Sequence, residues 1–180
     1  MGTQAMANST RQSPSDDRPL SEMLHPACVR AKLEATTLEA VIAEMVDLLV
    51  GIHGIGNRDV LIERYLARER LALSGSSVGR GIAIPHCFIP GVSKVSIALG
   101  FAPRGVEWKA SSGNPVKSID GQSVALLGLV YGPDGNAVSL AVIRLMRTLA
   151  RLPVRQYINV PPSATDLFQE TLRCSQALAG

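Results

Sequence analysis

The stretch Arg80-Gly81-Ile82-Ala83-Ile84-Pro85-His86 is the part of the chain around which the rest can be arranged. Glycine reaches positive φ and lets backbone approach a ligand, and proline keeps the preceding residue extended. The pattern predicts an extended segment that presents His86 in a short, stiff loop, closed by the turn Pro90-Gly91. His86 is a candidate for chemistry because imidazole titrates near neutral pH and can act as acid, base, nucleophile or metal ligand.

Hydrophobic periodicity on both sides of this stretch predicts alternating helices and strands. Thr36, followed three residues later by Glu39, forms a capping box for a first helix that Gly51 and Gly54 end. Asn57 caps a second helix over 58–70, with an inner face of Val60, Leu61, Tyr65 and Leu66. Strands are expected over 29–33, 95–101 and 122–131, and later helices over 136–152 and from Ser163 to about Leu178. This alternation favours an α/β layer fold with a mixed sheet.

The composition bounds the organisation of the chain. With 180 residues, 46% of them hydrophobic, the sequence fits one globular domain plus a tail. Residues 1–18 are polar and are expected to form a disordered leader, because they bury too little apolar surface to offset chain entropy. The domain is therefore expected over residues 19–180.

Several classes of function are disfavoured. Aromatic residues make up 4% of the chain and the net charge is +3, a poor basis for nucleic-acid binding. No apolar run reaches the length needed for membrane insertion. The three cysteines are far apart and form no CxxC, so we expect neither a zinc site nor a disulfide framework, and a cytoplasmic location is the simplest setting. No cofactor and no metal are predicted.

Three pieces of the sequence together resemble a known active-site signature. The segment from Gly81 to His86, with Pro90-Gly91-Val92 and Ala98-Leu99-Gly100, resembles type-2 enzyme IIA of the sugar phosphotransferase system, the mannitol/fructose and nitrogen-regulatory branch. The resemblance runs from about Leu20 to the C-terminal helix. It implies a three-layer α/β/α sandwich and makes His86 the phosphoryl acceptor.

The resemblance also implies which residues bind the phosphoryl group. Family members carry an Arg-Glu pair at the end of the helix before the glycine-rich loop. Arg68 matches this pair by its local sequence, Arg70 matches it by ungapped spacing, and both stay candidates for a bidentate clamp. Further candidates come from the loop itself, whose hydroxyls and backbone N–H groups can hold an anion: Ser76, Ser77, Gly79 and Gly81.

The sequence departs from the family at the second histidine. The matching position, counted back from Leu149-Ala150-Arg151-Leu152, is Val142, and no histidine follows His86. We expect Val142 to lie beside His86 as an apolar wall. Ser139, one helical turn earlier, can supply one hydroxyl, although a capping or solvated serine is the simpler interpretation.

Two functions are consistent with these features. In the first, Nδ1 or Nε2 of His86 takes a phosphoryl group from a histidine-containing phosphocarrier protein and passes it to a IIB-type partner, or keeps it as a regulatory signal. In the second, the chain is a binding module that regulates a kinase or transporter without transferring phosphate. A hydrolase with Cys87 as nucleophile is disfavoured, because adjacent side chains of an extended segment point to opposite sides. A metal site from His25, His53 and His86 lacks ligand spacing.

Overall fold

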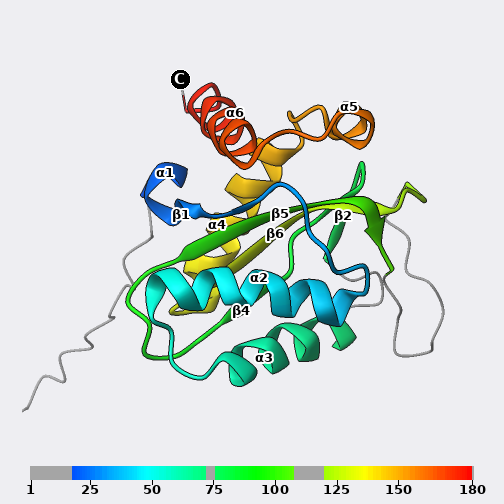
Figure 1. Ribbon diagram of the computed structural model, residues 1–180. Coiled ribbons are helices and arrows are strands. Elements are labelled where there is room, and N and C mark those ends of the chain that lie inside the picture. The colour runs from blue at the N-terminus through cyan, green and yellow to red at the C-terminus, as the bar shows by residue number, and fades with distance from the viewer. Residues whose placement is uncertain (1–17, 72–75, 108–119, 180) are drawn as a thin grey trace, which may run out of the picture.

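A computed structural model describes residues 18–71, 76–107 and 120–179, and these residues form a six-stranded mixed sheet between two layers of helices (Figure 1). The strands are β1 (Leu24–Arg30), β2 (Ser77–Gly79), β3 (Ile82–Ala83), β4 (His86–Phe88), β5 (Ser96–Val106) and β6 (Val124–Gly132). Their order is β1-β5-β6-β3-β2, and β4 also pairs with β6. The β5–β6 and β2–β3 pairs are antiparallel, and the other pairs are parallel.

Helices cover both faces of the sheet (Figure 1). They are α1 (Leu20–Met23), α2 (Leu38–His53), α3 (Arg58–Leu71), α4 (Gly135–Leu149), α5 (Val154–Asn159) and α6 (Ala164–Gln176). One face carries α2 and α3, whose Met45 and Tyr65 belong to one buried cluster. The other face carries the remaining helices, whose Leu145 and Leu167 belong to a second cluster. The expected α/β layer fold with a mixed sheet is thereby confirmed.

The ends of the helices follow local chemistry, with two corrections. Thr37, and not Thr36, caps α2, and its hydroxyl accepts from the N–H of Ala40 at 3.4 Å. Asn57 caps α3 as predicted, because its Oδ1 accepts from the N–H groups of Asp59 and Val60, at 3.0 and 3.3 Å. The predicted inner face of α3 is wrong at Val60, which is 50% exposed.

The segment that ends at His86 is more regular than expected. A tight hairpin joins β2 to β3, and His86 begins β4 where a loop was predicted. The apolar β6 provides the parallel partner that makes this possible: His86 pairs in register with Val130. Residues 1–17 of the predicted leader lie outside the described residues. Of the helices in the described ranges, none is both long and apolar enough to cross a membrane.

Candidate functional site

The imidazole of His86 is held in one orientation by the backbone before it. Its Nδ1 lies 2.9 Å from the carbonyl oxygen of Ile84. A carbonyl only accepts hydrogen bonds, so Nδ1 carries the proton in the neutral ring and donates it. The other nitrogen, Nε2, is then unprotonated, and its lone pair can accept a hydrogen bond or attack an electrophile.

The ring of His86 lines a pocket of about 380 Å³ between α3, β4 and the start of α4. The helix α3 contributes Arg64, Ala67, Arg68 and Leu71, β4 contributes His86, Cys87 and Phe88, and α4 contributes Gly135, Val138 and Ser139. The rim is apolar and open to solvent, since Leu71 is 81% and Phe88 53% exposed. The pocket therefore combines a histidine, two arginines and an apolar rim.

The structure separates the two arginines that the sequence left as alternatives. Nη2 of Arg68 lies 3.5 Å from Nε2 of His86. Arg70 instead pairs with Glu63 at 3.7 Å, on the surface of α3. Arg64 also lines the pocket and donates to the carbonyl oxygen of Phe88 at 3.4 Å. Arg64 is not among the binding residues predicted from the sequence, although its spacing of four residues from Arg68 puts both on one side of a helix.

The serines of the predicted anion loop point to protein groups. Ser76 donates to the carboxylate of Glu69 through both its N–H and its hydroxyl. Ser77 is buried, and its hydroxyl donates to the carbonyl oxygen of Ile82 at 3.4 Å. Neither serine is among the residues that line the His86 pocket.

The glycines of the same loop build the β2–β3 turn. Gly79 and Gly81 have φ of 87° and 72°, and Arg80 between them has φ of 57°. The two central residues of the turn are Arg80 and Gly81, and positive φ at both central residues is what a two-residue type I′ hairpin turn requires. Asp120 accepts from the N–H of Arg80 at 2.6 Å, and the guanidinium of Arg80 donates to the carbonyl oxygen of Ala150 at 2.6 Å. A Cβ added at Gly79 would meet Asp120 and one added at Gly81 would meet Ser123, and neither of these residues lines the His86 pocket.

The α4 side of the pocket also differs from the expectation. The residues of α4 that line it are Gly135, Val138 and Ser139, whereas Val142 is half-buried and packs on the hydrophobic core. Asp134 caps α4 by accepting from the N–H groups of Asn136 and Ala137, both at 2.9 Å, and the helix begins at Gly135, one residue before the predicted start. Its first two turns, and not its third, border the pocket.

The other chemical candidates are packed in the fold. Burial raises the pKa of Cys87 to about 12, which keeps the thiol protonated and weakly nucleophilic. His53 is half-buried: its Nε2 lies 3.9 Å from Sγ of Cys28, and its ring meets Tyr131 edge to face. Burial, Lys94 and His25 lower the pKa of His53. Within the described part of the chain, no group of three His, Cys, Asp or Glu side chains is arranged to hold a metal ion.

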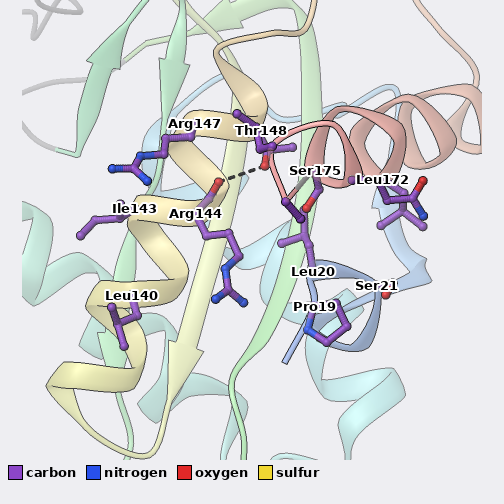
Figure 2. Close-up of a pocket in the computed structure, with 13 residues that line it drawn as sticks. Pro19, Leu20, Ser21, Leu140, Ile143, Arg144, Arg147, Thr148, Leu172 and Ser175 are labelled. Carbon is purple, nitrogen blue, oxygen red and sulfur yellow. Dashed lines mark hydrogen bonds between the residues drawn. The ribbon is translucent and has the colours of Figure 1, made fainter. Parts of the chain in front are cut away.

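A larger pocket, of about 480 Å³, lies between α1, α4 and α6 (Figure 2). Arg144 points from α4 toward the segment around Pro19 and donates to the carbonyl oxygen of Arg18. None of the described residues that line this pocket is a histidine, a cysteine or a carboxylate. Its size therefore does not make it the reactive site.

Comparison with known proteins agrees with the α/β layer fold. The model of the family "Phosphoenolpyruvate-dependent sugar phosphotransferase system, EIIA 2" matches residues 22–159, well over half of the chain. The chain belongs to this family.

The relatives of this chain include sugar-specific and regulatory proteins. The chain is 30% identical over 141 residues to the fructose-specific EIIABC component of Bacillus subtilis, covering 77% of this chain and 21% of that protein. It is 26% identical over 152 residues to a nitrogen regulatory protein of Bradyrhizobium diazoefficiens, covering 83% and 92%. The chain is 35% identical over 81 residues to the fructose-specific EIIA component of Haloferax volcanii, and this match spans 51% of that protein's length.

Solved structures show the same fold. Nitrogen regulatory protein IIA-Ntr from Neisseria meningitidis superposes with a TM-score of 0.65 at 21% identity, over 84% of this chain and 98% of that chain. A putative PTS IIA domain from Streptococcus pyogenes superposes with a TM-score of 0.63 at 17% identity, over 81% and 89%.

Proposed function

We propose that this protein is a phosphocarrier in which Nε2 of His86 accepts a phosphoryl group from a histidine-containing phosphocarrier protein. The observation that carries the proposal is the hydrogen bond from Nδ1 to the Ile84 carbonyl, which leaves Nε2 as the nucleophile at the pocket. In the step, the Nε2 lone pair attacks phosphorus, and the bond between phosphorus and the donor's imidazole nitrogen breaks. The bonding electrons return to the donor ring.

Arg68 supplies the electrostatic part of this step. Phosphoryl transfer passes through a loose transition state whose charge lies on the equatorial oxygens, so positioning and hydrogen-bond donors do most of the work. A guanidinium 3.5 Å from Nε2 can reach oxygens of a group attached there. Arg64 and Ser139 line the same pocket and offer further donors.

The exposed rim supports a protein as the donor. Leu71 and Phe88 present apolar surface beside the histidine, next to the positive charges of Arg64 and Arg68. A phosphorylated protein surface that is apolar around its own histidine would bury this rim and pair its phosphoryl group with the arginines. The phosphoryl group then passes to a cysteine of a IIB-type partner or serves as a signal. We place these exchanges in the cytoplasm, where free Cys28, Cys87 and Cys174 stay reduced.

A second candidate is a regulatory module that binds a kinase or transporter and does not transfer phosphate. One observation favours it: the chain's histidines are His25, His53 and His86, so α4 offers no second histidine to the pocket. The nitrogen regulatory relatives fit either candidate.

Mass spectrometry separates the two candidates. The protein is incubated with phosphoenolpyruvate, enzyme I and the histidine-containing phosphocarrier protein, and its intact mass is measured. The phosphocarrier gains one acid-labile phosphoryl group, which His86→Ala abolishes and His25→Ala or His53→Ala leaves intact. A wild-type protein without any gain, while a known enzyme IIA in the same mixture is labelled, would favour the regulatory module.

A further inference from the structure

The carboxylate of Glu69 is buried directly behind the site and is not explained by the proposed transfer step. Glu69 follows Arg68 in the last turn of α3, but it is only 6% exposed, whereas Arg68 is exposed. A buried carboxylate is costly unless it is hydrogen-bonded. The bonds that Glu69 makes therefore indicate what the fold uses it for.

These bonds go to the segment that leads into His86. Glu69 Oε2 accepts from the N–H of Ser76 at 3.0 Å, and its Oε1 accepts from the hydroxyl of the same serine. Both carboxylate oxygens thus hold one residue, which lies directly before β2. Burial raises the pKa of Glu69, and the two bonds from Ser76 oppose that shift.

Two further hydrogen bonds connect Ser76 to the imidazole. The carbonyl oxygen of Ser76 accepts from the N–H of Ile84 at 2.9 Å. The carbonyl oxygen of Ile84 in turn accepts from Nδ1 of His86 at 2.9 Å. The position of the Ile84 carbonyl therefore depends on where Ser76 is held, and Ser76 is held by Glu69.

We propose that Glu69 is a positioning residue, which acts through Ser76 and Ile84 to keep the proton of His86 on Nδ1 and the lone pair of Nε2 toward the pocket. The last turn of α3 then acts on both ring nitrogens: Arg68 directly at Nε2, and Glu69 at Nδ1 through two intervening residues. The consequence for transfer rests on the proposed function, but the effect on the imidazole does not.

The test uses the full-length, unphosphorylated protein with ¹⁵N-labelled histidine and no phosphoryl donor. Long-range ¹H–¹⁵N spectra at pH 8 report which ring nitrogen of His86 is protonated, and hydrogen exchange reports the Ile84 amide. The wild type is expected to show a single Nδ1–H form. Glu69→Ala should show both tautomers and about tenfold faster exchange at Ile84, the loss that one buried hydrogen bond implies.

Matched variants keep the proposal falsifiable. Glu69→Gln retains one acceptor oxygen and should partly rescue both readouts. Ser76→Ala removes only the hydroxyl bond and should have a smaller effect in the same direction. Glu63→Gln, an exposed carboxylate on the same helix, should match the wild type.

Two results would overturn the proposal. One is a folded Glu69→Ala protein with wild-type tautomer and wild-type Ile84 exchange. If Glu69→Ala does not fold, wild-type readouts in both Glu69→Gln and Ser76→Ala would overturn it equally. This test contains no phosphoryl donor, so its result does not depend on whether the protein is phosphorylated. A wild type that is never phosphorylated in the mass-spectrometry experiment would refute the proposed function and leave the effect of Glu69 on the imidazole standing.

Discussion

The two ends of segment 76–88 differ in sequence and in what they do: Gly79 and Gly81 lie near its start, and the glycine-free second half contains His86. At one end, the Gly79-Arg80-Gly81 turn is fastened to Asp120 and to the carbonyl oxygen of Ala150. At the other end, His86 lies in a pocket whose remaining walls come from α3 and α4. The glycines build the turn, whereas the pocket around His86 is lined by the preceding helix α3 and by α4, which is distant in sequence.

Apart from loss of His86 itself, the largest effect is expected at the histidine end, from Arg68→Ala. Loss of a charge-assisted hydrogen bond costs roughly 1.5–3 kcal/mol, so phosphorylation should slow by about one to two orders of magnitude. Arg70→Ala is the matched control, because Arg70 pairs with Glu63 and does not line the pocket. Rates come from quenched-flow labelling with one donor preparation. Equal slowing in both variants would mean that the rate depends on the total positive charge of α3 and not on the position of Arg68 at the pocket.

An effect on folding alone is expected at the turn end, from Gly81→Ala. Gly81 has φ of 72°, and an added Cβ would lie 3.1 Å from the carbonyl oxygen of Ser123. A left-handed conformation costs a non-glycine residue about 1–2 kcal/mol, so the free energy of unfolding in urea should fall by at least that order.

The labelling rate of folded Gly81→Ala protein should equal that of the wild type. Gly56→Ala, where an added Cβ meets nothing within 4 Å, is the control for stability. A variant of unchanged stability but slower labelling would place Gly81 at the phosphoryl group and remove the distinction between the two ends.

The smallest effect is expected on the α4 wall. Ser139→Ala removes one neutral donor, worth about 0.5–1.5 kcal/mol, so labelling should slow a few-fold. Ser139→His should accelerate labelling, because Ser139 lines the pocket, and Val142→His should not. The opposite ranking of the two histidine variants would show that sequence spacing located the second-histidine position better than the pocket does.

The sequence predicts the layers better than it predicts the site. Helices with side-chain caps, such as those after Asn57 and Ser163, and the continuous apolar strand β6 were found because their signals are local. The short helix α5 was missed, and no side-chain cap marks its start.

Site residues depend on tertiary packing, which spacing alone does not define. The choice between Arg68 and Arg70 depends on the rotation of α3 against β4, and the choice between Val142 and Ser139 depends on how α4 packs beside the pocket. Hydroxyls and glycines in a loop fit an anion site and a hairpin equally well by sequence. In the structure, Ser76 and Ser77 donate hydrogen bonds to protein groups.

The central claim is that Nε2 of His86 receives the phosphoryl group while Nδ1 keeps its proton. The most direct measurement is a long-range ¹H–¹⁵N and ³¹P spectrum of ¹⁵N-histidine-labelled protein, phosphorylated by phosphoenolpyruvate, enzyme I and the carrier protein. We predict phosphorus coupling to Nε2 of His86 and a protonated Nδ1. Phosphorus on Nδ1, or on any other residue, would contradict the account.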